Sequence, residues 1–167
     1  MKEKQVSWQE AHHLTERLAR KIKCDFKPDA VIAISSGGLV PGKLLKEMLG
    51  AKVIGVISAH GYDNSVRRSR FLVEKTISGF MPTHVDQKVL VVDDIVETGS
   101  TLKLVLETLD ELSGHGEWKV KTAALFVKPG AAFLPDYYEL SSNEWIVFPW
   151  EAKEIADEQI ENHGITL

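Results

Sequence analysis

Apolar residues recur along the chain in two patterns, and these patterns alternate. Short, β-rich apolar runs predict four strands, at residues 30–34, 52–58, 88–93 and 120–127. Between the runs, apolar residues return at helical spacing in residues 41–49, which Pro41 opens, and in residues 102–112, which end before two glycines. The unbroken Val-Leu-Val-Val run of the third strand is typical of a parallel strand that is covered on both faces.

The beginning of the chain has the signature of an amphipathic helix. Ser7 and Glu10 stand at the spacing of a capping box, in which two side chains satisfy free amides at a helix N-terminus. Leu14, Leu18 and Ile22 follow at helical intervals. We therefore expect a first helix that packs one face against the sheet.

The alternation of strands and helices predicts the fold class. It indicates an α/β protein with a mostly parallel sheet, helices on both faces and ligands at the carboxyl ends of the strands. The sequence has no internal repeat, low-complexity segment or linker, so residues 1–167 are expected to form a single domain. The polar segment after Trp150 is expected to be a closing helix.

Composition narrows the class of protein further. Of the 167 residues, 44% are apolar and 26% are charged, as in ordinary globular proteins. A net charge of −4, spread over both halves, argues against a nucleic-acid partner, and no apolar stretch approaches the ~20 residues of a membrane span. The single Cys24 can form no internal disulfide, which fits a cytoplasmic location.

The strongest chemical signal is the segment 91–101, where acids end a predicted strand and small hydroxyl residues open a helix. Asp93 and Asp94 are adjacent carboxylates, which suit ribose hydroxyls or a magnesium ion that bridges substrate phosphates. Free amides of the first helical turn, together with hydroxyls and a glycine, form a cradle for a phosphate monoester. The cradle consists of Thr98, Gly99, Ser100 and Thr101. An N-capped helix after a buried strand would explain the cradle but not the paired acids.

A second glycine loop follows the first predicted strand. It consists of Ser35, Ser36, Gly37 and Gly38. Its backbone amides suit a pyrophosphate group, although a plain glycine turn explains the loop when it is considered alone. The loop also reproduces most of a Walker A motif, but Leu44 stands where that motif needs Ser or Thr to ligate magnesium.

Together the two segments resemble the phosphoribosyl pyrophosphate signature and the pyrophosphate loop of type I phosphoribosyltransferases. The resemblance implies that the 5′-phosphate binds at residues 98–101 and the pyrophosphate at residues 35–38. It implies that Asp93 and Asp94 orient the ribose and hold Mg²⁺. It also implies that Glu97 is catalytic with these two acids, because the family's purine enzymes carry there an acid, usually aspartate, that manages the proton on the attacking base nitrogen. An acid favourably placed near a helix N-terminus, without a catalytic role, is the alternative for Glu97.

The pyrophosphate loop carries one feature expected from the family and one departure from it. Family members often have a cis peptide bond in this loop, and here it would join Ser35 to Ser36. Similar purine enzymes carry a basic residue at the position of Ser36. The missing positive charge bears on how strongly this chain holds pyrophosphate.

The predicted base site lies downstream. An ammonium such as that of Lys128 can donate to an exocyclic oxygen, and an indole such as that of Trp145 can stack on a base. Considered alone, the two residues are more simply explained by a solvated turn and a core tryptophan. Their order and spacing resemble those of bacterial xanthine-guanine phosphoribosyltransferases, which implies a 6-oxopurine site formed by Lys128, Trp145 and Ile146.

The resemblance thus implies an enzyme of purine salvage that transfers the 5-phosphoribosyl group from phosphoribosyl pyrophosphate to a nucleobase and releases pyrophosphate. Its partners would be these two small molecules, and relatives commonly form dimers or tetramers. A regulatory protein of the same fold, which binds phosphoribosyl pyrophosphate without turnover, is the alternative.

Residues 60–87 match that family poorly and form a long stretch between two predicted strands. Arg67, Arg68 and Arg70 lie near its start. We expect a small hood or lid here, in which one of the arginines covers the pyrophosphate and partly replaces the charge missing at Ser36. A solvated basic stretch without a catalytic role is the alternative.

Overall fold

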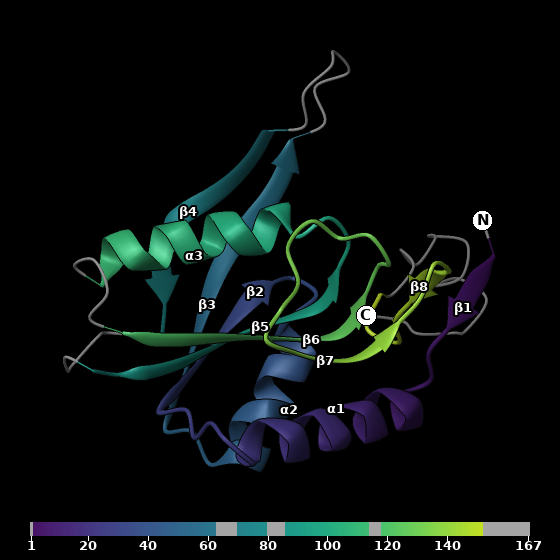
Figure 1. Ribbon diagram of the computed structural model, residues 1–167, viewed down its shortest axis with the longest axis horizontal. Coiled ribbons are helices and arrows are strands. Elements are labelled where there is room, and N and C mark those ends of the chain that lie inside the picture. The colour runs from purple at the N-terminus through teal and green to yellow at the C-terminus, as the bar shows by residue number, and fades with distance from the viewer. Residues whose placement is uncertain (1, 63–69, 80–85, 114–117, 152–167) are drawn as a thin grey trace, which may run out of the picture.

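The computed structural model describes residues 2–62, 70–79, 86–113 and 118–151, of which 60–62 and 70–76 are described by their backbone alone. A six-stranded sheet has the order β4-β3-β2-β5-β6-β7 (Figure 1). Its strands are β2 (Ala30–Ser35), β3 (Val53–Tyr62), β4 (Arg70–Ser78), β5 (Lys88–Val96), β6 (Lys119–Val127) and β7 (Tyr137–Ser141). The four predicted strands are confirmed as β2, β3, β5 and β6.

The sheet is mostly parallel, as predicted. Each neighbouring pair from β3 through β7 runs parallel, and only β4 is antiparallel to its partner β3. The first five residues of β2 are buried, and so are four consecutive residues of β5. Continuous apolar runs suit this position because helices cover both faces of a central parallel strand.

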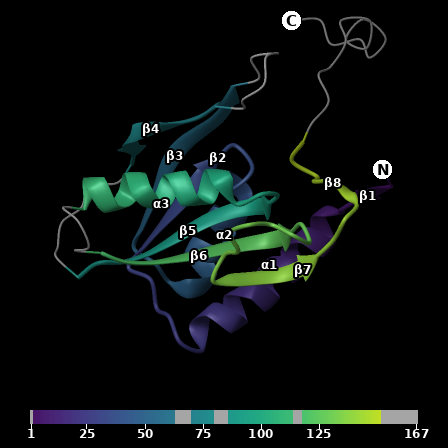
Figure 2. The same cartoon turned by 45° about the horizontal axis from the view of Figure 1, so that its top comes forward.

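Three helices flank the sheet in the described part of the chain. They are α1 (Trp8–Lys23), α2 (Leu39–Leu49) and α3 (Ser100–Leu112). α1 and α2 cover one face and α3 covers the other (Figure 1), and the turned view separates α1 from α3 in the same way (Figure 2). None of the three is long and apolar enough to cross a membrane.

The predicted start of α1 is confirmed by its N-terminal contacts. Ser7 is the N-cap, and its hydroxyl accepts a hydrogen bond from the amide of Glu10 at 3.1 Å. α1 is also held by the edge strand β7. Arg17 and Lys21 of α1 form ion pairs with the fully buried carboxylate of Glu139 in β7, at 3.1 and 2.8 Å. These contacts fix α1 against β7.

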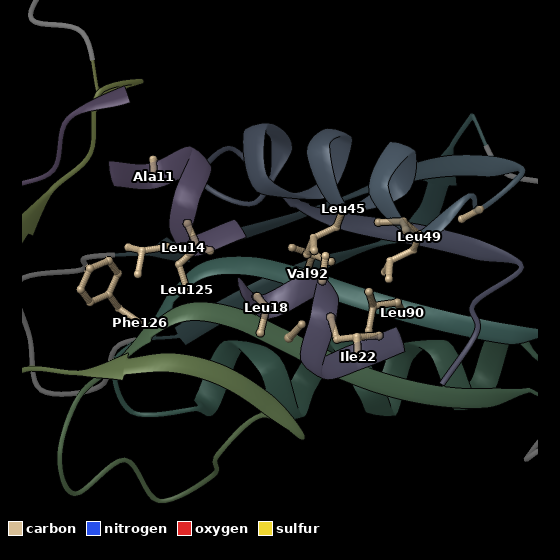
Figure 3. Packing of buried hydrophobic residues seen from close by; sticks show 14 of the residues in the cluster. Ala11, Leu14, Leu18, Ile22, Leu45, Leu49, Leu90, Val92, Leu125 and Phe126 are labelled. Atoms are coloured by element: carbon tan, nitrogen blue, oxygen red, sulfur yellow. The ribbon is translucent and has the colours of Figure 1, made fainter. Parts of the chain in front are cut away.

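Two apolar clusters fill the spaces on either side of the sheet. In the first, Ile22 of α1 lies close to Leu90 of β5, and Leu45 of α2 lies close to Val92 of the same strand (Figure 3). In the second, Leu102, Val105 and Leu109 of α3 pack against the opposite face. The alternation of β5 side chains between the two clusters anchors the carboxyl end of the strand, where the predicted site residues lie.

Residues 60–87, the long stretch expected between two strands, contain strand residues of their own. β3 continues to Tyr62, and residues 70–78 form the antiparallel edge strand β4. Backbone pairing between β3 and β4 therefore involves much of this stretch. The sequence did not predict β4, because this strand mixes charged and apolar residues. Arg70 begins β4, whereas Arg67 and Arg68 lie outside the described residues, as does the closing helix expected after Trp150.

A small second sheet stands apart from the main one. It pairs β1 (Glu3–Gln5) with β8 (Trp145–Val147) in parallel, so the N-terminus meets the segment that carries the predicted base-stacking tryptophan. Figure 1 shows this pair beside the carboxyl ends of β6 and β7. Both strands are too short to be recognised from their own residues.

Candidate active site

The carboxyl ends of β2, β5 and β6 lie side by side, because these strands are parallel and β5 lies between the other two. Each end leads into residues predicted to bind substrate. Residues 35–38 end β2, residues 93–101 end β5, and Lys128 directly follows β6. The topology therefore gathers the three predicted subsites at one edge of the sheet.

The two adjacent acids have different surroundings. Both lie inside β5, which extends past its predicted end to Val96. Asp93 is half-buried and lines a pocket, whereas Asp94 is only 6% exposed. The amide of Asp94 donates to Asp93 Oδ1 at 3.0 Å, and the amide of Ile95 donates to Asp94 Oδ1 at 2.7 Å. Asp93 is therefore the more accessible of the two acids from this pocket.

Burial raises the pKa of both carboxyl groups. For Asp93, burial is joined by the negative charge of Asp94, and its pKa lies well above the ordinary range. For Asp94, hydrogen bonds from the Trp150 indole and the Ile95 amide only partly offset the burial, so its pKa is also raised. The pair is thus costly to ionise in the free protein, and a bound cation or ligand hydroxyl groups would favour its charged form.

The pocket beside Asp93 has the features of an anion site. Its volume is about 260 Å³, and its lining includes Glu97, Thr98, Gly99 and Thr101. Gly99 is the N-cap of α3 with φ of 85°, and this helix has no acidic residue in its first turn. Glycine has no side chain to cap the helix, and the amide of Ser100 donates instead to the hydroxyl oxygen of Thr98 at 3.2 Å. The positive end of α3 favours an anion beside this turn.

A segment that the sequence did not reveal holds this turn in shape. The amides of Ala132 and Phe133 donate to the carbonyl of Thr98 at 3.0 and 3.4 Å. A Cβ atom on Gly99 would lie 2.2 Å from the carbonyl oxygen of Phe133. The segment after β6 therefore engages the carbonyl of the turn and leaves no room for a side chain at Gly99.

The glycine loop after β2 touches the acids directly. A Cβ atom on Gly37 would lie 2.4 Å from Asp94 Oδ2, and one on Gly38 would lie 2.3 Å from the carbonyl oxygen of Val92. Only glycine allows so close an approach between these two segments. The peptide bond between Ser35 and Ser36 is cis, which confirms the feature expected from the family resemblance. Ser36 itself is exposed.

The residues predicted to bind the base form a looser group than those around the pocket. The amide of Lys128 donates to the carbonyl of Val96 at 2.8 Å, and its ammonium donates to the carbonyl of Glu144. Trp145 in β8 is 53% exposed, so its ring is accessible to a ligand. The side chain of Ile146 is buried in the core, which leaves only its backbone for the predicted contact with a base.

Trp150 is a further residue at this site that the sequence analysis did not single out. Its indole Nε1 donates to Asp94 Oδ2 at 3.1 Å. The two residues are far apart in sequence, so no local pattern could have linked them. In the sequence, the only signal for Trp150 was its closeness to Phe148 in the aromatic-rich run that begins at Trp145.

The acids suit a metal that relies on its substrate for ligands. Within the described residues, no group of three or more His, Cys, Asp and Glu side chains is placed to hold a metal ion. Mg²⁺ is commonly bound by one or two carboxylates, waters and substrate phosphates rather than by a complete protein cage. Asp93 offers carboxylate oxygens, which are the ligands that Mg²⁺ prefers, and it lines the pocket. It therefore fits that mode of binding.

The edge of the sheet thus defines an α/β protein with a glycine turn at a helix N-terminus beside paired acids. Residues 3–155 match the family described as the phosphoribosyl transferase domain. The chain belongs to this family, and its fold is that of the type I phosphoribosyltransferases.

Similar proteins include several purine enzymes. A xanthine-guanine phosphoribosyltransferase of Idiomarina loihiensis is 32% identical over 87% of this chain and 85% of the relative. The structure of a purine phosphoribosyltransferase from Pyrococcus horikoshii is similar with a TM-score of 0.77 and 32% identity, covering 94% of this chain and 99% of the other. A xanthine-guanine-hypoxanthine phosphoribosyltransferase from Helicobacter pylori has a TM-score of 0.77 and 25% identity, covering 96% and 97%.

Proposed function

We propose that the chain transfers the 5-phosphoribosyl group of phosphoribosyl pyrophosphate to a 6-oxopurine and releases pyrophosphate. The observation that carries this proposal is the contact between Gly37 and Asp94, which joins the glycine loop to the paired acids. One extended substrate with a phosphate at each end would span the two segments. The family and the purine enzymes among the relatives support the same activity.

In this proposal, the 5′-phosphate binds at the N-terminus of α3, at residues 98–101. The carbonyl of Thr98 is engaged by Ala132 and Phe133, which favours amide and hydroxyl groups as the ligands of the anion. The pyrophosphate binds the amides of residues 35–38. The ribose then lies over the acids between these two subsites, where Asp93 lines the pocket and Asp94 lies against Gly37, and its hydroxyls are oriented by the two acids.

The reaction is a displacement at the anomeric carbon. A nitrogen of the base forms a bond to this carbon while the bond to the pyrophosphate oxygen breaks, and the bonding electron pair leaves with pyrophosphate. Glu97, which lines the pocket, takes the proton from the attacking nitrogen. Positive charge develops on the ribose, and Asp93 stabilises it. Mg²⁺ held by Asp93 and Asp94 would supply charge neutralisation for the departing pyrophosphate.

Lys128 and Trp145 form the proposed base subsite. The ammonium of Lys128 is hydrogen-bonded to the carbonyl of Glu144, and because an ammonium has three donors it can also donate to the exocyclic oxygen of a 6-oxopurine. The same carbonyl belongs to the peptide that joins Glu144 to Trp145. Lys128 therefore connects the end of β6 to the strand whose exposed indole would stack on the base.

The test is to mix the protein with phosphoribosyl pyrophosphate, Mg²⁺ and guanine, xanthine, hypoxanthine or adenine, and to measure pyrophosphate and nucleoside monophosphate. We expect equal amounts of both products with the 6-oxopurines. Asp93→Asn is the matched control, because it keeps the size of the side chain and removes its charge. Binding of phosphoribosyl pyrophosphate without product from any base would contradict the proposal.

We also propose a setting for the enzyme. Cys24 is exposed and free, which suits the reducing cytoplasm. A homo-oligomer, dimer or tetramer, is expected as in the family, and light scattering coupled to size exclusion would measure it. A molar mass of 18.6 kDa at working concentration would contradict the oligomer alone.

A further inference from the structure

Asp94 is the more enclosed of the two acids, and its carboxylate lies between its neighbour Ile95 and two segments distant in sequence, those of Gly37 and Trp150. The amide of Ile95 donates to Oδ1 at 2.7 Å, and the indole of Trp150 donates to Oδ2 at 3.1 Å. Gly37 lies so close that an added Cβ would meet both oxygens within 2.5 Å. A carboxylate offers about four acceptor sites, so these two donors leave others for a ligand while they fix the plane of the group.

The donor on Trp150 is itself held firmly. Its ring stacks on Phe148 with centroids 4.7 Å apart and planes at 10°, and Phe148 is only 2% exposed. Phe148 meets the fully buried Phe126 edge-on at 5.7 Å. Trp8 completes the group at 5.9 Å from Trp150. The indole thus reaches Asp94 from a rigid aromatic support that is continuous with the core.

We propose that Trp150 is a positioning residue that orients Asp94 for phosphoribosyl pyrophosphate. This inference rests on the proposed function. A charge-assisted hydrogen bond holds a carboxylate in one orientation, and a preoriented carboxylate loses less freedom when it meets the ribose. Without the indole N–H, Asp94 keeps the Ile95 amide on one oxygen, but its other oxygen is free to turn away from the ligand.

A purely structural role makes a different prediction. If the N–H only satisfied a buried carboxylate, its loss would lower the melting temperature without a specific effect on ligand affinity. Trp150→Phe separates the two roles, because phenylalanine keeps a ring for the stack on Phe148 and removes the donor. Trp8→Phe is the matched control, since it removes an indole from the same aromatic group at a position 60% exposed.

The experiment measures the affinity of the full chain for Mg²⁺-phosphoribosyl pyrophosphate by calorimetry, with melting temperatures and steady-state constants for the same variants. Trp150→Phe is expected to weaken affinity about tenfold and to raise KM for phosphoribosyl pyrophosphate more than KM for guanine. Trp8→Phe is expected to change affinity less than about twofold. In an Asp94→Asn background, Trp150→Phe should have almost no further effect, because the coupled partner is already altered.

A second measurement does not depend on the variant folding. In the wild-type chain, the NMR signal of the Trp150 indole N–H should shift on titration with Mg²⁺-phosphoribosyl pyrophosphate, while that of Trp8 should move little. Equal affinity of Trp150→Phe and wild type, or an unmoved Trp150 signal on saturation, would overturn the positioning role and leave the proposed function standing. A wild-type chain that binds no phosphoribosyl pyrophosphate would overturn both.

Discussion

The proposed 5′-phosphate side and the proposed base side of the site are built in different ways. The phosphate side is one continuous stretch, residues 93–101, in which strand, turn and helix N-terminus follow one another. The base side is assembled from Lys128, the peptide of Glu144 and a β8 strand that needs β1 for pairing. Local sequence thus supplies the elements of the proposed phosphate subsite, with Phe133 packed against its turn, whereas even the elements of the proposed base subsite come from distant segments.

The largest effect is expected from Asp93→Asn, on the phosphate side. Turnover should fall by about 10² to 10³-fold, because a charge that stabilises the developing positive charge is lost. Stability should rise instead. The pKa of Asp93 is raised in the folded state. Such a group stabilises the fold fully at pH values below its unfolded pKa, and this stabilisation is lost as the pH rises through its folded pKa. At pH 7 the charge of Asp93 therefore destabilises the fold.

The stability half of this prediction is checked by thermal unfolding without Mg²⁺ at neutral pH and near pH 3, with turnover measured in parallel. The melting temperature of Asp93→Asn should exceed that of wild type at neutral pH, and the difference should shrink in acid. A variant that melts below wild type at pH 7 would show that the buried charge is not a cost to the fold.

A glycine pair tests how tightly the phosphate turn is packed. Gly99 and Gly130 both have positive φ, at 85° and 86°, but only Gly99 is in contact with another segment, Phe133. Gly130→Ala should cost only the ~1 kcal/mol or so of backbone strain, with turnover kept. Gly99→Ala should add a clash with backbone and raise KM for phosphoribosyl pyrophosphate tenfold or more. Similar kinetics for the two variants would mean that Phe133 does not shape the subsite.

On the base side, Lys128→Ala should change selectivity rather than phosphate binding. A charged lysine donates to the oxygen of a 6-oxopurine but cannot accept from the amino group of adenine, so wild type should prefer guanine at least tenfold. Lys128→Ala should erode that preference, and Trp145→Ala should weaken all purines together. Specificity constants for the four bases measure this, and a preference untouched in Lys128→Ala would remove the lysine from the base subsite.

The smallest effect is expected at Asp136, which anchors the segment between β6 and β7 that includes Phe133. Asp136 accepts hydrogen bonds from the amide and hydroxyl of Thr122, both at 2.8 Å, and pairs with Lys121. Burial acts to raise the pKa of Asp136, but these partners outweigh it and the pKa is lowered. Its stabilisation is therefore present above the unfolded pKa and lost as pH falls through the folded pKa.

Asp136→Asn should accordingly lower the free energy of unfolding at neutral pH by at most about 1 kcal/mol, since the group is exposed to solvent. Urea unfolding at pH 7 and at about pH 2 should show the two proteins converging in acid, with base preference unchanged throughout. A difference that persists at the lower pH would assign the stabilisation to packing rather than to charge.

These contrasts also explain what the sequence could predict. The parallel strands β2, β3, β5 and β6 and the three helices depend on neighbouring residues, and local pattern identified them. The contact of Trp150 with Asp94 and that of Phe133 with Gly99 join distant segments, so periodicity carries no trace of them. β4 was missed because an edge strand lacks the continuous apolar run of a central one.

Hydrogen–deuterium exchange of the wild-type chain, with and without Mg²⁺-phosphoribosyl pyrophosphate, tests the central claim most directly. If one substrate spans the two loops, amides in residues 35–38 and 98–101 should both exchange more slowly in its presence, while those of β7 remain unchanged. Inorganic phosphate alone should protect residues 98–101 and leave residues 35–38 unprotected. Protection of only one loop by phosphoribosyl pyrophosphate, or of neither, would contradict a shared site.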